Sequence, residues 1–355
     1  MAVARSLNSA HPDAELLWVG GIGGMETDLV SRAGLSFAGV HAGAIHGVGP
    51  WRLLANGARM ARGLWESLGL MRRVRPCALM VTGGFVALPV ALAAWLSRVP
   101  VFLYVPDIEP GWALKFLGGL ARSVALTAEA SRVFFRPGPG RRVTITGYPT
   151  RPELAPADPA AARAFFGLEA GLKTLLVFGG SRGARSINRA LLAALPELLA
   201  ECQVIHLSGE LDWPEVRGAS GTLPESLRDR YRCYPYLHEE MGSALAAADL
   251  VLSRAGASIL GEYPLFGLPS IVVPYPHAWR YQKVNADYLV DRGAAVMLKD
   301  EDLGTSLLPV VRALLREPDR LSAMGAAARS LAVRDSARRI ADEFHRLARE
   351  EGARP

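Results

Sequence analysis

A stretch of the chain, residues 253–286, contains the residue types that a phosphorylated ligand requires. A short apolar run, residues 248–253, leads into Arg254 and the small residues 255–258, and a helical segment follows. A helix that begins in this way leaves its first backbone N–H groups uncrowded, and its positive dipole end also attracts a phosphate. Glu262 lies about one helical turn beyond Ser258. Its carboxylate can therefore face the same ligand and accept hydrogen bonds from a ribose diol.

Two other turns carry glycines directly after apolar runs. The sequence Gly-Gly-Ser-Arg-Gly-Ala at residues 179–184 lies between an apolar run, 174–178, and a helical segment, 185–199. A second Gly-Gly pair follows the apolar residues that end at Val81 and Thr82. The predicted phosphate loops therefore contain Gly83, Gly84, Gly179, Gly180 and Gly183. Short glycine motifs also occur in ordinary strand–helix–strand units, so each motif alone leaves that alternative open.

Apolar runs that end in glycine turns and alternate with helical patterns indicate parallel strands buried on both faces. The chain of 355 residues is long enough for two domains of this kind. We place the boundary at residues 147–151, because a Pro- and Ala-rich segment, 152–159, follows and suits a hinge. The predicted fold is therefore α/β, with one doubly wound domain at residues 1–150 and a second at residues 151–335.

The excess of basic over acidic residues lies in the first half of the chain. Residues 1–150 hold 15 Lys and Arg against 8 Asp and Glu, a balance of +7, so the total of +6 leaves −1 for residues 151–355. An anionic membrane surface or an anionic substrate explains this excess, and solvated helix faces are the alternative. Nucleic acid is disfavoured as a partner, because no stacking aromatic residues interleave with the arginines.

A helical segment, residues 51–75, carries six arginines together with an apolar stripe. Such a helix can lie on an anionic bilayer, although packing of the stripe on a sheet is the alternative. The next segment, 77–97, is uncharged and long enough to span a membrane. Gly83, Gly84 and Pro89 interrupt it, so we expect a strand, a turn and a helix there.

The order of these motifs resembles the nucleotide-sugar signature of GT-B glycosyltransferases, and it is most similar to the MurG-type family. The glycine loop at residues 179–184 differs from the family's Gly-Gly-Ser-Gln-Gly-Ala at one position. The stretch 253–285 continues with Gly-Leu-Pro, a strand, Pro-x-Pro-His, Gln282 and Asn285. The resemblance covers nearly the whole chain from residue 14 onward. It implies two Rossmann-like domains that face a cleft, with a last helix, 336–355, that crosses back onto the first domain.

The resemblance also implies which residues bind the donor. Ser181 would meet the pyrophosphate, Leu237 would lie against uracil, Glu262 would hold the ribose, and Gln282 would contact the sugar hydroxyls. The complete set is Arg151, Ser181, Asn188, Leu237, Ala257, Ser258, Ile259, Leu260, Gly261, Glu262, Gln282 and Asn285.

Two residues of this set have plainer alternatives. Arg151 would approach the donor from the hinge, but it could also pair with a hinge carboxylate. Asn285 would support the turn that holds Gln282, but it could also cap the following helix. Tyr281 stands where some members have a second glutamine or a histidine, so the sugar selectivity stays open.

Two departures from the family pattern concern the acceptor side. The family's opening strand and first glycine loop, which carries a histidine, have no counterpart; we expect a misplaced start codon and an exposed sheet edge. The family's His-Glu-Gln-Asn is replaced by Tyr-Val-Pro-Asp at residues 104–107. Asp107 is therefore our candidate for the catalytic base, with Glu109 as a weaker candidate. Capping of a helix near Trp112 is the alternative for both acids.

The resemblance implies an inverting hexosyltransferase of peptidoglycan synthesis. Its donor would be UDP-N-acetylglucosamine and its acceptor a muramyl-peptide linked to a polyprenyl pyrophosphate, which is the conversion of lipid I to lipid II. Helix N-termini and backbone amides would stabilise the departing pyrophosphate, so we expect no metal and no cofactor besides the donor. We expect peripheral binding to the cytoplasmic face of the cell membrane, through the arginines of residues 51–75 and through Trp112, Phe116 and Leu117. The alternatives are a transferase of the same fold with another lipid or small-molecule acceptor, a nucleotide-sugar epimerase, and a non-catalytic donor-binding relative.

Overall fold

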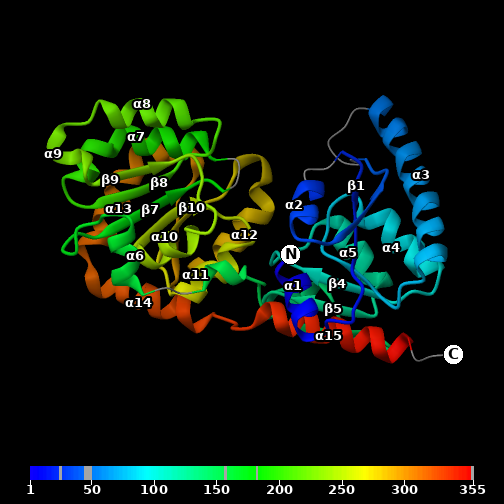
Figure 1. The fold of residues 1–355 in the computed structure, drawn as a ribbon. Helices are drawn as coiled ribbons and strands as arrows, with labels where there is room; N and C mark the ends of the chain where they lie inside the picture. Colours follow the sequence, from blue (N-terminus) through cyan, green and yellow to red (C-terminus); the bar gives the residue numbers. More distant parts are fainter. Residues whose placement is uncertain (24–25, 44–49, 156–157, 181–182, 353–355) are drawn as a thin grey trace. The chain divides into compact units, whose positions relative to one another are not determined.

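A computed structural model describes the chain except for residues 24–25, 44–49, 156–157, 181–182 and 353–355 (Figure 1). The chain divides into two compact units. The first unit consists of Met1–Pro149 and Asp335–Pro355, and the second consists of Thr150–Arg334. Both divisions lie one residue from the boundaries that the sequence predicts.

The described strands of the first unit form two parallel sheets. In one sheet β1 (Leu17–Gly21) pairs with β2 (Ser36–Val40), and the other has the order β3 (Leu79–Val81), β4 (Val101–Val105), β5 (Ser123–Leu126) and β6 (Arg142–Ile145). The helices are α1 (Ala2–Ala10), α2 (Glu26–Arg32), α3 (Pro50–Val74), α4 (Ala87–Leu96), α5 (Trp112–Leu120), the short η1 (Glu129–Phe134) and α15 (Ser336–Gly352). The uncharged segment 77–97 is a strand, a turn and a helix, as predicted. In the described part of the chain, no helix combines the length and apolar character needed to cross a bilayer.

Strand β4 shows why the larger sheet of the first unit is buried on both faces. Successive side chains of a strand point to opposite faces. Leu103 and Val105 belong to a core formed with α4 and α5, whereas Phe102 and Tyr104 belong to a core formed with α1 and α15. The last helix of the chain therefore completes the first unit, where it lies beside α1 (Figure 1).

The second unit contains one parallel sheet of six strands. Its order is β12 (Ala295–Met297), β11 (Ser270–Val273), β10 (Leu250–Arg254), β7 (Thr174–Phe178), β8 (Gln203–Leu207) and β9 (Tyr231–Tyr234). The chain runs outward from β7 to β9 and then returns to the other side of β7, so the strand order reverses between β7 and β10. Open α/β sheets bind ligands at this kind of switch point, beyond the carboxyl ends of the strands.

Helices cover this sheet. They are α6 (Pro159–Phe165), α7 (Arg185–Leu199), α8 (Trp213–Gly221), α9 (Glu225–Arg228), α10 (Met241–Ala247), α11 (Ile259–Phe266), α12 (Trp279–Val290), α13 (Leu303–Arg316) and α14 (Pro318–Ser330), with short 3₁₀ turns η2 (Pro152–Leu154), η3 (Pro276–Ala278) and η4 (Asp300–Asp302). Ile187, Leu191 and Leu195 of α7 lie four residues apart on one helix face and are fully buried in the core under β7. Packing of this stripe fixes the start of α7 at the carboxyl end of β7.

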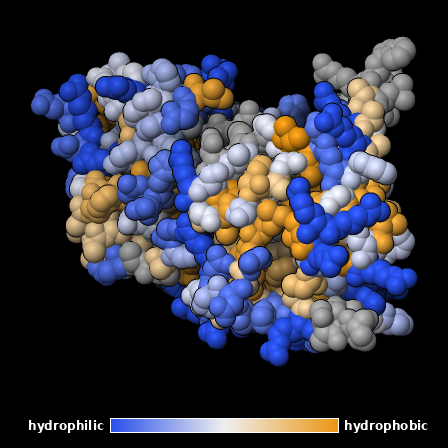
Figure 2. Space-filling view, turned by 45° about the vertical axis from the view of Figure 1, so that its right-hand side comes forward, coloured by the Kyte–Doolittle hydropathy of each residue, from blue (hydrophilic) through white to orange (hydrophobic). Residues whose placement is uncertain are grey.

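Apolar side chains gather in patches on the surface, as Figure 2 shows. On α5 the side chains of Trp112 and Phe116 are 54% and 45% exposed, and their rings stack at 6.0 Å. Leu117, which we predicted to share this membrane-facing surface, is 0% exposed and belongs to the core around α4. That part of the prediction is wrong, because Leu117 lies on the face of α5 that packs on the sheet.

Candidate functional site

The two segments with the residue types for phosphate binding meet at the switch point of the second sheet. Strands β7 and β10 are parallel neighbours, with Phe178 opposite Ser253. The loop after β7 and the turn after β10 therefore leave the same edge of the sheet side by side. The sequence predicts each loop separately, whereas their adjacency follows from the strand order.

Close packing explains the glycines of the loop after β7. A Cβ atom at Gly179 would lie 2.2 Å from the amide nitrogen of Ala184, and one at Gly183 would lie 2.2 Å from the carbonyl oxygen of Ser208. Gly180 has a φ of +89° and Gly183 a φ of +74°, which other residues rarely adopt. Ser181, the predicted pyrophosphate contact in this loop, lies outside the described residues.

The start of α7 is suited to an anion. Its N-cap residue is Ala184, whose side chain cannot accept a hydrogen bond, so no side chain caps the helix. The first amides of a helix have no partner within the helix and lie at its positive dipole end. The loop and the helix start together can therefore surround a phosphate with backbone donors.

The turn after β10 supplies fewer donors than the sequence indicated. The amides of Ile259, Leu260 and Gly261 already donate to carbonyl oxygens of residues 256–258, at 3.1–3.2 Å. The side chains of Ile259 and Leu260 are also buried, at 2% and 6% exposure. Ile259, Leu260 and Gly261 therefore build the turn, and the amides of Ala257 and Ser258 are the candidates for a phosphate. The donor contact of the first three residues stays a prediction.

Glu262 has the position that the predicted ribose contact requires. It follows this turn on the first turn of α11, and its side chain is 9% exposed. Burial raises the pKa of its carboxyl group to about 7, although the charge of Arg151 and a hydrogen bond from Ser258 act in the opposite direction. The charge of Arg151 thus acts on the carboxylate predicted to hold the ribose, which favours a place for Arg151 at the donor site.

Asn285 supports the turn after β10. Its side chain is 0% exposed, and Nδ2 donates to the carbonyl oxygen of Ala255 at 3.3 Å. It lies within α12 and not before it, so the alternative that it caps the following helix is wrong. Gln282, one turn earlier in the same helix, accepts a hydrogen bond from the amide of Tyr275 through Oε1 at 2.8 Å. Gln282 therefore fixes the Pro-x-Pro-His loop at the same edge of the sheet.

Asn188 has a structural position, and its predicted contact with the donor stays a prediction. It is 1% exposed, and its Nδ2 donates to the carbonyl oxygen of Ser208 at 2.8 Å and to Asp212 at 2.9 Å. Its Oδ1 lies 3.0 Å from Nε2 of His206. Burial lowers the pKa of His206 to about 3, so the ring is neutral and donates through Nε2. Asn188 therefore joins the start of α7 to the loop after β8.

Leu237 lies in the loop after β9, on the same edge of the sheet, with its side chain 7% exposed. Arg254 is a further residue of this edge that the sequence reasoning did not single out. Its guanidinium pairs with Asp300, donates to Ser186 at 2.7 Å and lies over the ring of Tyr275 at 5.3 Å. It thereby connects the start of α7 with the segments that follow β11 and β12. The signal for this residue in the sequence is an arginine directly at the end of an apolar run that predicts a buried strand.

Glycines also follow β3 in the first unit. Gly83 and Gly84 have φ values of +122° and +84°, and the amide of Ala87 donates to the carbonyl oxygen of Gly84 at 3.3 Å. The pair therefore turns the chain from β3 into α4, at the carboxyl edge of the sheet. This geometry supports the predicted loop, and nothing in it requires a phosphate.

The two candidate acids follow β4 at the same edge. Glu109 is 9% exposed and pairs with Lys115 at 3.0 Å, whereas Asp107 is half-buried. The N-cap residue of α5 is Gly111, so neither acid is the N-cap residue itself. The ion pair with Lys115 occupies Glu109, and Asp107 remains the predicted base.

The second unit has two helix starts and a buried carboxylate at the switch point of its parallel sheet, and it is joined to another parallel α/β unit. This combination defines the class of GT-B proteins that bind nucleotide sugars. Residues 1–126 match the glycosyltransferase family 28 N-terminal domain, and residues 174–340 match the family 28 C-terminal domain. A UDP-N-acetylglucosamine–N-acetylmuramyl-(pentapeptide) pyrophosphoryl-undecaprenol N-acetylglucosamine transferase of Roseiflexus sp. (strain RS-1) is 43% identical over 369 residues. This alignment covers 94% of the chain and 84% of the relative. The chain belongs to this family of N-acetylglucosamine transferases.

Solved structures agree on the fold. The crystal structure of Acinetobacter baumannii MurG matches with a TM-score of 0.77 and 24% identity, over 97% of this chain and 94% of that one. A putative UDP-N-acetylglucosamine 2-epimerase from Listeria monocytogenes matches with a TM-score of 0.69 and 13% identity, over 100% and 94% of the two chains. The GT-B fold is thus common to transferases and epimerases, and the sequence identity is what separates them.

Proposed function

We propose that the protein transfers N-acetylglucosamine from UDP-N-acetylglucosamine to a muramyl-peptide linked to a polyprenyl pyrophosphate, with inversion at the anomeric carbon. The observation that carries this proposal is the meeting of the α7 start, the turn before α11 and the buried Glu262 at one switch point. The printed names of the curated relatives supply the sugar and the class of acceptor.

The chemical step needs a stabilised leaving group. As the sugar passes through an oxocarbenium-like state, negative charge develops on the pyrophosphate of UDP. Backbone amides at two helix starts are fixed donors that stabilise this charge without reorganisation. We therefore assign this role to the start of α7 and to Ala257 and Ser258, and we propose a reaction that needs no metal or other cofactor.

The acceptor hydroxyl must lose its proton to a base. We assign this role to Asp107, because its carboxylate follows β4 at the carboxyl edge of the sheet and is half-buried. Glu109 is the poorer candidate, since its charge is offset by Lys115 at 3.0 Å.

We also propose that the first unit binds the cytoplasmic face of the membrane peripherally. The amino group of Lys115 on α5 lies 4.5 Å from the ring of Phe134 in η1, which connects η1 with the helix that carries Trp112 and Phe116. Val133 is 70% exposed and Phe134 is 36% exposed. Amphipathic surfaces of exposed aromatic side chains with nearby basic residues suit the interface of an anionic bilayer.

The deciding experiment is incubation of the protein with UDP-N-acetylglucosamine, with and without the lipid-linked muramyl-peptide. We expect UDP release and a disaccharide product only when the acceptor is present. A 2-epimerised UDP-sugar formed without acceptor would identify an epimerase instead. Donor binding without any turnover would identify a binding protein, and transfer only to other hydroxyl compounds would identify a transferase with a different acceptor.

A further inference from the structure

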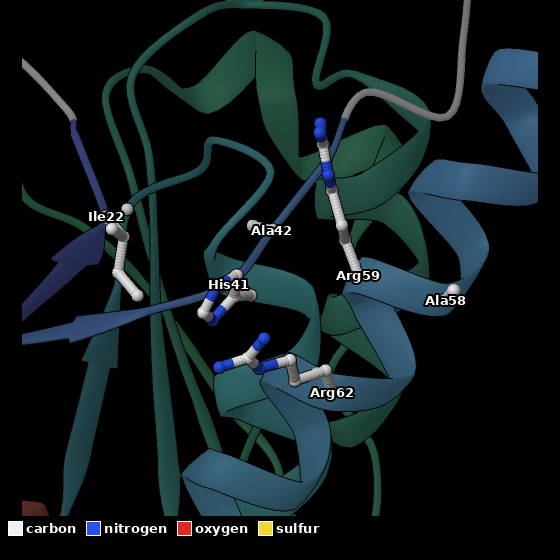
Figure 3. A pocket seen from close by; sticks show the side chains of 7 residues that line it. Ile22, His41, Ala42, Ala58, Arg59 and Arg62 are labelled. Carbon is white, nitrogen blue, oxygen red and sulfur yellow. The ribbon is translucent and has the colours of Figure 1, made fainter.

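The first unit contains a pocket that the proposed donor chemistry does not use. Its volume is about 600 Å³, and its lining includes Gly21 at the end of β1, Ile22 after it, His41 and Ala42 after β2, and Arg59 and Arg62 of α3 (Figure 3). A Cβ atom at Gly21 would lie 3.4 Å from Val86, directly after the Gly83–Gly84 turn. The pocket is therefore on the edge of the first unit where the carboxyl ends of its strands lie, which is where open α/β folds bind ligands.

Two glycines let the chain after β2 lie directly on α3. A Cβ atom at Gly63 would lie 1.9 Å from the carbonyl oxygen of His41, and one at Gly43 would lie 2.7 Å from the side chain of Asn56. Larger residues at either position would push the strand end away from the helix. This close approach holds His41 beside the arginines of α3.

Glu66 fixes the polar groups of the pocket. Its carboxylate accepts hydrogen bonds from the amide of His41, from Nδ1 of the same ring and from Nε of Arg62, each at 2.9 Å. Burial would raise the pKa of Glu66, but these three hydrogen bonds lower it to about 2, so the group is ionised at neutral pH. These contacts hold the His41 ring and the Arg62 guanidinium on the same carboxylate.

The pocket keeps an excess of positive charge. The carboxylate of Glu66 offsets the charge of the Arg62 guanidinium. Within the described residues, Arg59 makes a long contact of 3.5 Å with the side chain of Asn56. In Figure 3 the side chain of Arg62 extends from α3 toward His41. Planar guanidinium groups bind phosphate and carboxylate oxygens through paired N–H donors.

We propose that the pocket formed by His41, Arg59 and Arg62 binds an oxyanion of the acceptor substrate. This inference rests on the proposed function, because an acceptor of that class carries a pyrophosphate at one end and peptide carboxylates at the other. Both groups have the chemistry that the two guanidiniums recognise. The volume exceeds that of a single phosphate, so the pocket also holds part of the group to which the anion is attached.

The test compares Arg59→Gln/Arg62→Gln with the parent protein in steady-state transfer. We expect the KM for the acceptor to rise tenfold or more, with the KM for UDP-N-acetylglucosamine within a factor of about three. The control is Arg338→Gln on α15, which removes one charge from the same unit at a side chain that is 75% exposed. An unchanged acceptor KM in the folded double variant, or an equal rise in the Arg338→Gln control, would overturn the proposal.

Direct binding separates this proposal from the proposed function. Calorimetry with farnesyl pyrophosphate and with N-acetylmuramyl-pentapeptide distinguishes the pyrophosphate from the carboxylates as the bound group. We expect one of the two probes to bind the parent protein and to lose at least tenfold in affinity in the double variant, even if no transfer is detected. Binding of neither probe, or equal binding by both proteins, would exclude the site. If the double variant does not fold, Arg59→Gln alone serves, since its side chain makes the weaker contact.

Discussion

At the scale of single residues, Glu262 determines most of what can be tested about the donor. We expect Glu262→Ala to weaken binding of UDP-N-acetylglucosamine by roughly 1–3 kcal/mol, because the ribose diol loses charge-assisted hydrogen bonds in a buried position. Isothermal calorimetry on the folded variant measures this directly. Unchanged affinity would show that the ribose lies elsewhere.

The raised pKa of Glu262 makes the same site sensitive to pH. The value of about 7 lies above the usual 4.5, so the carboxyl group is largely protonated below neutral pH and then accepts fewer hydrogen bonds. We expect the affinity for UDP-N-acetylglucosamine, whose pyrophosphate diester does not titrate there, to fall as the pH decreases below about 7. Glu262→Gln should remove this dependence.

The corresponding effect on stability has the opposite direction. The carboxyl group of Glu262 has a higher pKa in the folded state than in the unfolded state. Its contribution to stability is therefore fully present below the unfolded-state pKa, and it is lost as the pH rises through the folded-state pKa. Glu262→Gln should therefore raise the melting temperature of the free protein at pH 8 relative to the parent and have little effect at pH 4.

Asp107 is the residue-scale prediction for the acceptor side. Asp107→Asn keeps the shape of the side chain and removes the base, so we expect turnover to fall by about 10²–10⁴-fold while donor binding is unchanged. Single-turnover rates at saturating acceptor provide the measurement. Activity within about tenfold of the parent would show that another group accepts the proton of the acceptor hydroxyl.

At the scale of elements, the loop after β7 should not tolerate a side chain at Gly183. In Gly183→Ala the new Cβ atom would meet the Ser208 carbonyl oxygen at 2.2 Å, and the φ of +74° would be strained. We expect a loss of about 1–3 kcal/mol in the free energy of unfolding, together with weaker donor binding. Gly218→Ala is the matched control, because a Cβ atom at Gly218 of α8 meets nothing within 4 Å. Equal denaturant midpoints for the two variants would contradict this account.

The sequence predicts elements better than it predicts the pairs of side chains between them. The uninterrupted apolar run of β4 and the glycine after β7 are local signals, and both are found where expected. The bonds of Asn188 to Asp212 and of His41 to Glu66 join residues 24 and 25 positions apart. Such pairs depend on how two elements pack, and no local spacing encodes that packing. The same limit explains Leu117, whose burial depends on which face of α5 meets the sheet.

At the scale of the whole molecule, the uneven charge should appear as salt-dependent membrane binding. The balance is +7 for residues 1–150 and −1 for residues 151–355. We expect sedimentation with anionic vesicles that weakens as added salt shortens the Debye length below about 10 Å. Trp112→Ser/Phe116→Ser should reduce this binding without affecting the KM for the donor. Equal binding to neutral vesicles would argue against the electrostatic part.

The place of α15 has a consequence for the order in which the polypeptide matures. The first unit is made of two separate pieces of chain, whereas the second unit is one continuous segment, Thr150–Arg334. During synthesis from the N-terminus, Phe102 and Tyr104 have no α15 to cover them until residues 336–352 leave the ribosome. Translation adds on the order of 5–20 residues per second, so these apolar side chains stay uncovered for roughly ten seconds or more while the later segment is made. The second unit, although it is translated later than most of the first unit, can therefore finish folding before it.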